Sequence, residues 1–239
     1  MQNLGMLEVR NVSKFFGGVV ALKDVSIEVK PGELVGVIGP NGSGKTTLVN
    51  IITGYYRPDS GKVFALGTDI TGVEPHKIAS QGVARTFQVP KIFRSLTVWE
   101  NLLAALSYNR SAREKAYENA VKLLKSLELW EKRNLQASAL SGGQQRLLEI
   151  ARALLTNPKV FLLDEPTAGL NPVMIEKLRE LLMELKERGA AMLMVEHNMQ
   201  VVTSFCDRVV AMSEGAVIAN GVPHHVLTSA EVIESYLGS

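Results

Sequence analysis

Residues 34–47 read LVGVIGPNGSGKTT, and this stretch decides the fold. Leu34–Ile38 is apolar and predicts a buried strand, while Leu48–Ile52 predicts the helix that follows. Between them, residues 39–47 match G-x-x-x-x-G-K-[ST], the pattern of a phosphate-binding loop, whose glycines let backbone N–H groups turn inward. These N–H groups and the positive end of the helix form an anion site. We expect nucleotide phosphates there, with Lys45 on the β- and γ-phosphates and Thr46 on Mg²⁺.

The composition limits the classes of protein to consider. The 239 residues are 46% hydrophobic, which suits one large domain or one domain with an inserted subdomain. A net charge of +2 gives no reason to expect nucleic acid as a partner. The single cysteine, Cys206, allows no intramolecular disulfide or cysteine metal cluster, and its apolar neighbours predict core packing. No signal peptide and no run of 18 apolar residues is evident, so a membrane role requires a partner.

Apolar patterning predicts strands that alternate with helices, and therefore a largely parallel sheet. The predicted strands are Leu7–Val12, Val25–Lys30, Leu34–Ile38, Lys62–Leu66, Val83–Gln88, Val160–Leu163, Ala191–Val195, and a hairpin of Arg208–Met212 with Ala216–Ala219. The predicted helices are Pro75–Gln81, Thr97–Leu106, Ala112–Leu129, one containing Glu149–Leu155, and Pro172 to about Arg188. Residues 95–156 are predicted to be a helical insertion in an α/β frame formed by 1–94 and 157–239.

Two helix starts carry clear capping signals. Thr97 with Glu100 forms a predicted capping box. Asn171 is a predicted N-cap because Pro172 follows at the first helical position, and Gly189 is expected to end that helix.

An acidic pair follows the apolar strand Val160–Leu163. Ligand groups gather at the carboxyl ends of strands in open α/β sheets, so Asp164 and Glu165 are expected near the phosphates. Asp164 is the candidate Mg²⁺ partner, and Glu165 is the candidate base for the attacking water. The alternative is a simple acidic turn before Pro166.

The sequence Leu140-Ser141-Gly142-Gly143-Gln144 is, taken alone, only a turn that begins a helix. It gains meaning in a series: phosphate loop, Gln88, this motif, Asp164-Glu165 and His197. In this order and over essentially its whole length, the chain resembles the ATP-binding cassette (ABC) ATPases, for which Leu-Ser-Gly-Gly-Gln is the signature.

The resemblance implies a P-loop NTPase of ABC type, with an N-terminal antiparallel β subdomain and an inserted α-helical subdomain. It also implies a head-to-tail homodimer, or a heterodimer with a related ATPase, that sandwiches two ATP molecules with Mg²⁺. Each site would pair one subunit's phosphate loop with the other's Ser141–Gln144, a second anion clamp. ATP would then join the subunits and hydrolysis would release them.

Further roles follow from the resemblance, residue by residue. Gln88 matches the glutamine that contacts Mg²⁺ and the attacking water, and His197 matches the switch histidine on the γ-phosphate. Phe16, or its neighbour Phe15, is the candidate adenine-stacking aromatic; a core aromatic is the alternative. Asn171 replaces the usual aspartate but can still cap the next helix. The expected catalytic residues are Glu165, His197 and Gln88; the Mg²⁺ residues are Thr46, Gln88 and Asp164; the ATP-binding residues are Phe16, Gly39, Pro40, Asn41, Gly42, Ser43, Gly44, Lys45, Thr46, Thr47, Ser141, Gly142, Gly143 and Gln144.

Within the family, three segments resemble the ATPases of branched-chain amino-acid importers: Arg85–Gln88, Asp164–Pro172 and Tyr236–Gly238. The last also matches lipopolysaccharide-export ATPases, which stay open as an alternative. This resemblance implies transmembrane permease subunits as partners, a solute-binding protein acting indirectly, and a peripheral position on the cytoplasmic face of the membrane. None of these residues contacts the solute, so the substrate rests on the resemblance alone.

Two other classes compete with a transporter ATPase. Soluble ABC ATPases of DNA repair or the ribosome usually bear long coiled coils or two cassettes, and this chain has neither. A small-molecule P-loop kinase would not need Ser141–Gln144.

Overall fold

The computed structural model describes residues 6–106 and 113–237, which form two compact units. Unit 1 covers residues 6–85, 159–164 and 185–237, and unit 2 covers 86–106, 113–158 and 165–184. Each unit is described by itself. No helix in the described ranges combines the length and apolarity required to cross a bilayer.

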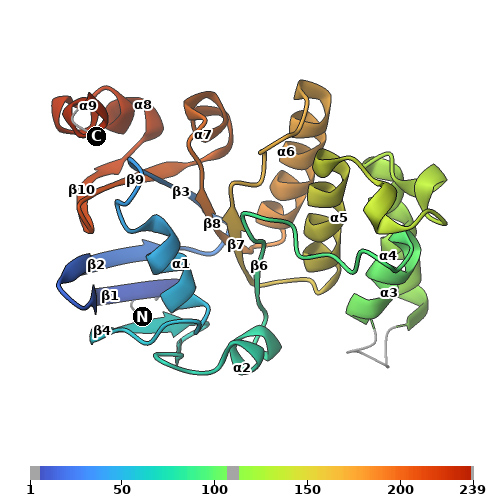
Figure 1. The fold of residues 1–239 in the computed structure, drawn as a ribbon, viewed down its shortest axis with the longest axis horizontal. Coiled ribbons are helices and arrows are strands. Elements are labelled where there is room, and N and C mark those ends of the chain that lie inside the picture. The colour runs from blue at the N-terminus through green and yellow to red at the C-terminus, as the bar shows by residue number, and fades with distance from the viewer. Residues whose placement is uncertain (1–5, 107–112, 238–239) are drawn as a thin grey trace. The chain divides into compact units, whose positions relative to one another are not determined.

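Unit 1 contains a six-stranded sheet in the order β10-β9-β3-β8-β7-β6 (Figure 1). The five strands from β9 to β6 run parallel, and β10 pairs antiparallel with β9. The central strands are apolar throughout because both faces are covered, as is usual in parallel sheets. The strands are β3 (Leu34–Ile38), β6 (Val83–Arg85), β7 (Val160–Asp164), β8 (Ala191–Val195), β9 (Arg208–Ser213) and β10 (Ala216–Gly221).

A second, antiparallel sheet of unit 1 has the order β2-β1-β4-β5. Its strands are β1 (Leu7–Phe16), β2 (Val19–Val29), β4 (Ser60–Ala65) and β5 (Thr68–Asp69). The expected mixture of a parallel core sheet and an N-terminal antiparallel sheet is therefore confirmed. The sequence prediction of β1 and β2 was too short, since register shifts between Val9 and Phe15 break the two-residue alternation that reveals a strand. It also missed the two-residue β5.

One hydrophobic core joins the two sheets of unit 1 to α1 (Lys45–Ile52). Buried residues of α1 face this core: Leu48, Val49, Ile51 and Ile52. The other helices of unit 1 are short: α2 (Pro75–Ser80), α7 (Met199–Phe205), α8 (Pro223–Leu227) and α9 (Ala230–Leu237). Cys206 follows α7 and is buried as predicted, and this burial raises the pKa of its thiol.

Unit 2 is helical (Figure 1). It has its own hydrophobic core. Its helices are α3 (Val98–Leu106), α4 (Arg113–Ser126), α5 (Gly142–Leu155) and most of α6 (Pro172–Glu187), with short 3₁₀ turns at Trp130–Lys132 and Ala137–Ala139. Both predicted caps are confirmed. Thr97 and Glu100 exchange hydrogen bonds, and Asn171 Oδ1 accepts from Met174 N at 2.9 Å.

Several boundaries differ from the prediction by one to three residues. β6 ends at Arg85 rather than Gln88, because the carbonyls of Phe87 and Gln88 accept hydrogen bonds from Arg146. The β9–β10 turn has two residues rather than three, Glu214 and Gly215, and both have positive φ, as a tight hairpin requires. α4 is shorter than predicted at its end, and the predicted first residue, Ala112, lies outside the described ranges.

Candidate functional site

The loop between β3 and α1 in unit 1 depends on glycines for its path. Gly39 has φ 150°, and a Cβ atom on it would lie 2.1 Å from Met212 O. Gly44 has φ 100°, and a Cβ atom there would lie 2.5 Å from Ala21 O. Gly42 has φ 80° but faces open space. The first two glycines therefore let the loop pack on β9 and β2, while the third leaves room beside the loop for a ligand.

The loop and the start of α1 are suited to an anion. Lys45 Nζ donates to Gly39 O and Pro40 O, both at 2.8 Å, which places the ammonium on the loop. Within the described chain no side chain caps the N-terminus of α1, where Gly44 is the N-cap. The positive end of the helix is thus left for another partner, and a phosphate is the usual one.

Strand register brings Asp164 to the same edge of unit 1 as this loop. Val195 of β8 pairs with Val37 of β3 on one side and with Asp164 of β7 on the other. With neighbouring strands about 4.8 Å apart, Asp164 lies roughly 10 Å from Val37, two residues before the loop begins. The backbone therefore places Asp164 and the phosphate loop at the same carboxyl edge of the sheet, as predicted.

Asp164 is buried and pairs with Arg85, which was not among the predicted site residues. Arg85 Nη2 lies 3.4 Å from Asp164 Oδ2, and Arg85 Nη1 donates to Asn50 Oδ1 at 2.8 Å and Thr53 Oγ1 at 3.0 Å. Asn50 and Thr53 lie at the end of α1, so Arg85 ties this helix to the carboxyl end of β7. In the sequence, Arg85 is visible only as a basic residue two positions after Val83, the start of an apolar strand. Its pairing with Asp164 can be predicted only when β6 and β7 are known to be neighbours.

His197 follows β8, the strand between the phosphate-loop strand and the Asp164 strand. It is exposed, as a residue that contacts a ligand must be. The carboxylate of Glu196, which is 1% exposed, accepts from the amides of His197 (3.1 Å) and Asn198 (3.3 Å). Asn198 in turn caps α7. The backbone that carries His197 is therefore fixed by hydrogen bonds on both sides.

The signature motif of unit 2 forms the N-terminus of α5. Gln144 N donates to Ser141 Oγ at 3.3 Å and Ser141 N donates to Gln144 Oε1 at 3.2 Å, a complete capping box. Ser141 and Gly142 are exposed, whereas Gly143 is buried. The hydroxyl of Ser141 accepts in the capping box, and its proton can still be donated outward.

Gln88 and Glu165 lie together in unit 2, although 77 residues separate them in sequence. Gln88 Nε2 is 3.4 Å from Glu165 Oε1. Glu165 adopts φ 47°, a left-handed conformation that is uncommon outside glycine and often found at functional sites. The carboxylate and the amide are thus held within reach of a common small ligand.

Phe15 and Phe16 are 47% and 43% exposed, so neither is the core aromatic that was the alternative. The Phe16 ring meets Tyr56 edge-on at 5.2 Å between centroids, and Lys14 Nζ lies 5.4 Å from its centre. Phe15 N donates to Asp59 at 2.7 Å. Both rings are thus exposed enough to stack on a base, and Phe16 is the one with a described aromatic contact.

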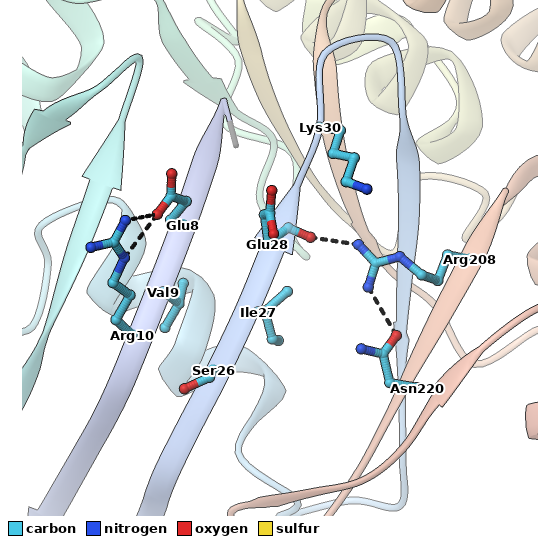
Figure 2. Close-up of a pocket in the computed structure, with 9 residues that line it drawn as sticks. All are labelled: Glu8, Val9, Arg10, Ser26, Ile27, Glu28, Lys30, Arg208 and Asn220. Carbon is cyan, nitrogen blue, oxygen red and sulfur yellow. Dashed lines mark hydrogen bonds and ion pairs between the residues drawn. The ribbon is translucent and has the colours of Figure 1, made fainter. Parts of the chain in front are cut away.

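A charged groove of about 470 Å³ lies elsewhere on unit 1, between β2 and the β9–β10 hairpin (Figure 2). It is lined by Glu8, Val9, Arg10, Ser26, Ile27, Glu28, Lys30, Arg208 and Asn220, none of which belongs to the predicted site. Its guanidinium groups already have partners: Arg10 pairs with Glu8, and Arg208 bonds Glu33, Asn220 and the carbonyl of Glu28.

The predicted residues fall into two sets. Unit 1 carries Phe16, the loop residues Gly39, Pro40, Asn41, Gly42, Ser43, Gly44, Lys45, Thr46 and Thr47, and Asp164 and His197; unit 2 carries Gln88, Ser141, Gly142, Gly143, Gln144 and Glu165. Across residues 6–106 and 113–237, no cluster of three or more His, Cys, Asp or Glu side chains is arranged to hold a metal. Mg²⁺ prefers oxygen donors and completes its shell with phosphate oxygens and water. The hydroxyl of Thr46 and the carboxylate of Asp164 are donors of this kind.

Known proteins resemble this chain in sequence and in fold. A family model described as "ABC transporter" matches residues 22–168. The chain is 43% identical to a probable branched-chain amino acid transport ATP-binding protein LivG of Archaeoglobus fulgidus, over 98% of this chain and 96% of that protein. The structure resembles the ADP conformation of MJ1267, an ATP-binding cassette of an ABC transporter (TM-score 0.86, 38% identity, 99% and 100% coverage). It also resembles the dimeric post-hydrolysis state of the cassette MJ0796 bound to ADP and Pi (TM-score 0.82, 32% identity, 91% and 99% coverage). The chain belongs to the ABC transporter family.

Proposed function

We propose that this chain is the ATP-hydrolysing subunit of an importer of branched-chain amino acids. The observation that carries the proposal is that one chain has two helix starts suited to an anion. One is the start of α1 after the phosphate loop in unit 1, which no side chain caps, and the other is the exposed start of α5 at Ser141 in unit 2. A kinase needs only the first. Two such groups in one chain suit a nucleotide bound between two subunits, and the dimeric cassette MJ0796 supports this.

In this proposal the phosphate loop binds ATP through its backbone N–H groups. Lys45 neutralises the β- and γ-phosphates, and Phe16 stacks on the adenine. Mg²⁺ would be held by Thr46, Gln88 and Asp164, and it supplies positive charge against the phosphate oxygens. Ser141 and the amides that follow it bind the γ-phosphate of the ATP held by the other subunit.

Hydrolysis then requires a base and a group that senses the γ-phosphate. Glu165 accepts the proton of the attacking water, oriented by Gln88, which already bonds its carboxylate. His197 donates to the γ-phosphate from the end of β8. Once this phosphate is lost, Ser141 loses its ligand, so the subunits separate.

The transport role is inferred from the relatives of this chain, and it requires partner subunits. Permease subunits would carry the solute, a solute-binding protein would deliver it, and this chain would lie on the cytoplasmic face of the membrane. Branched-chain amino acids are the solute named for the LivG relative. The test of the solute is stimulation: a branched-chain amino-acid permease should raise the ATPase rate of the purified chain, and no stimulation while another permease stimulates it would overturn the assignment.

The test of the enzyme is the variant Glu165→Gln. It retains the phosphate loop but loses the base, so it should bind ATP, hydrolyse it barely, and elute as a dimer on gel filtration with Mg-ATP. Wild-type protein without nucleotide is the control. Elution as a monomer under saturating Mg-ATP argues against the dimeric site.

A second variant tests whether each site is shared. Ser141→Arg should abolish turnover, because the new side chain fills the clamp offered to the other subunit. Lys45→Ala should also be inactive, yet a mixture of the two variants contains dimers with one intact site. Partial return of activity in the mixture supports sharing; full activity of Ser141→Arg alone contradicts it.

A further inference from the structure

Two charged side chains are buried on α5, the helix that begins at the signature motif. Arg146 is 3% exposed and Glu149 is 5% exposed. Neither contacts nucleotide in the mechanism above. Burial of a charge is unfavourable unless it is paired and hydrogen-bonded, so the partners of these two residues show what the burial achieves.

Arg146 holds the backbone of a distant segment. Its Nη1 donates to Phe87 O and its Nη2 donates to Gln88 O, so the two arms of one guanidinium bind successive carbonyls. Nη1 also lies 3.3 Å from Glu149 Oε2. The planar fork of arginine suits such paired acceptors, whereas a lysine ammonium is a single point of charge.

Glu149 and Arg152, about one and two turns further along α5, also bond the backbone of this segment. Glu149 Oε1 accepts from Lys91 N at 2.8 Å, and Arg152 Nη1 donates to Lys91 O at 2.7 Å. The Arg152 guanidinium also lies 4.6 Å from the ring centre of Phe93. Burial raises the pKa of Glu149, while the amide of Lys91 and the charge of Arg146 act against that rise.

Three side chains of the held segment stay available to ligands or partners. Gln88 is exposed, and Val89 and Phe93 are 64% and 49% exposed, while Ile92 packs against the core of unit 2. The backbone of residues 87–93 is thus fastened to α5 at four carbonyl or amide groups, and Gln88 is left exposed.

We propose that Arg146, Glu149 and Arg152 are positioning residues that fasten residues 87–93 to α5, so that Gln88 and Ser141 move as one body. The inference rests on the proposed ATPase function, because it assigns Gln88 and Ser141 to the nucleotide site.

The competing explanation is that Arg146 and Glu149 form a buried ion pair that serves stability alone. Unit 2 offers a control for loss of an arginine–glutamate pair. Arg179 and Glu176 of α6 also lie three residues apart, but their side chains are 37% and 54% exposed, against 4% and 6% for Arg146 and Glu149. Arg179→Lys therefore removes the same guanidinium from an exposed pair, and exchange in β3 shows whether Arg146→Lys acts through stability alone.

The test measures kcat, ATP affinity and hydrogen exchange of the full-length chain. In Arg146→Lys, kcat should fall about tenfold or more, because Gln88 loses its fixed position, while the Kd for ATP stays within about twofold since Lys45 and its loop are unchanged. Amides of residues 87–93 should exchange faster, but those of β3 should not. Arg179→Lys should match wild type in all three measurements.

Glu149 and Arg152 keep the proposal testable if Arg146→Lys folds poorly. Glu149→Gln keeps an oxygen for Lys91 N and should retain slow exchange at that amide, whereas Glu149→Ala should lose it. Arg152→Lys, at a less buried position, should lower kcat with unchanged ATP affinity.

The outcomes distinguish failure of the proposed ATPase function from failure of the positioning role. If wild-type protein fails to hydrolyse ATP, the proposed function fails. If wild type is active and Arg146→Lys and Arg152→Lys both keep its kcat and its exchange pattern, the positioning role fails. A fall in kcat accompanied by equal weakening of ATP binding and faster exchange in β3 also overturns it, because the residues would then serve stability alone.

Discussion

Gly143 of the signature motif packs directly against the carbonyl of Gly169, 26 residues further along unit 2. A Cβ atom on Gly143 would lie 2.6 Å from Gly169 O, closer than real Cβ contacts allow. Gly169 belongs to the segment between Glu165 and the cap of α6. The absent side chain therefore sets how closely the start of α5 approaches this segment.

Gly143→Ala should consequently lower stability, by about 1–3 kcal/mol, because the new methyl group overpacks against rigid backbone. Gly142→Ala is the matched control, since a Cβ atom there meets nothing within 4 Å. That control should keep or slightly raise the Tm, as alanine favours helix more than glycine does. Thermal unfolding of both variants measures this; equal Tm values would contradict the packing argument.

Arg85→Ala should destabilise unit 1 by about 3 kcal/mol, because it leaves the carboxylate of Asp164 buried without its cation. The side chains of Arg85 and Asp164 are only 7% and 5% exposed. Lys62→Ala is the control, since it breaks the pair of Lys62 with Asp69, whose side chains are 63% and 40% exposed, and should cost under about 1 kcal/mol. Denaturant unfolding of both variants gives the comparison, and similar losses would argue against the special role of Arg85.

Lys45→Ala should weaken ATP binding strongly while leaving the fold intact. The ammonium of Lys45 donates to Gly39 O, Pro40 O and Ser43 Oγ, all in its own loop, so the change acts first on the loop that should hold the phosphates. Titration with a fluorescent ATP analogue measures the affinity, and thermal unfolding without nucleotide serves as the control. Unchanged affinity in a folded variant would exclude this loop as the phosphate site.

The stability of unit 1 should depend on pH through Asp69. A hydrogen bond from the Thr71 side chain, with the Thr71 amide and Lys62, lowers the pKa of Asp69 from 3.8 to about 2. Because the folded value lies below the unfolded one, the stabilisation is present above about pH 4 and is lost as the pH falls towards 2. Since the Asp69 side chain is 40% exposed, the stabilisation that it contributes is under about 1 kcal/mol.

Asp69→Asn is the variant that checks this pH dependence. The difference in unfolding free energy between wild type and variant should be larger at about pH 6 than at about pH 3. Urea unfolding at both pH values measures it. A difference that stays constant with pH would show that Asp69 titrates alike in the folded and unfolded chains.

The amino-acid sequence by itself determined the local features of this protein. Leu34–Ile38 and Ala191–Val195 have the same bounds in the structure as in the prediction, because a fully buried strand is a continuous apolar run. The caps at Thr97, Ser141 and Asn171 depend on residues no more than three positions apart. The order of motifs along the chain also indicated the family that the comparisons show.

Only the tertiary structure decided which distant residues meet. Arg85 with Asp164, Arg146 with the carbonyls of Phe87 and Gln88, and Gly143 with Gly169 are contacts between separate segments. A charged residue looks the same in sequence whether it is solvated or buried. The order of strands in the sheet and the packing of α5 decide which of these charged groups are buried and therefore require a partner. The periodicity of the sequence does not show which groups these are.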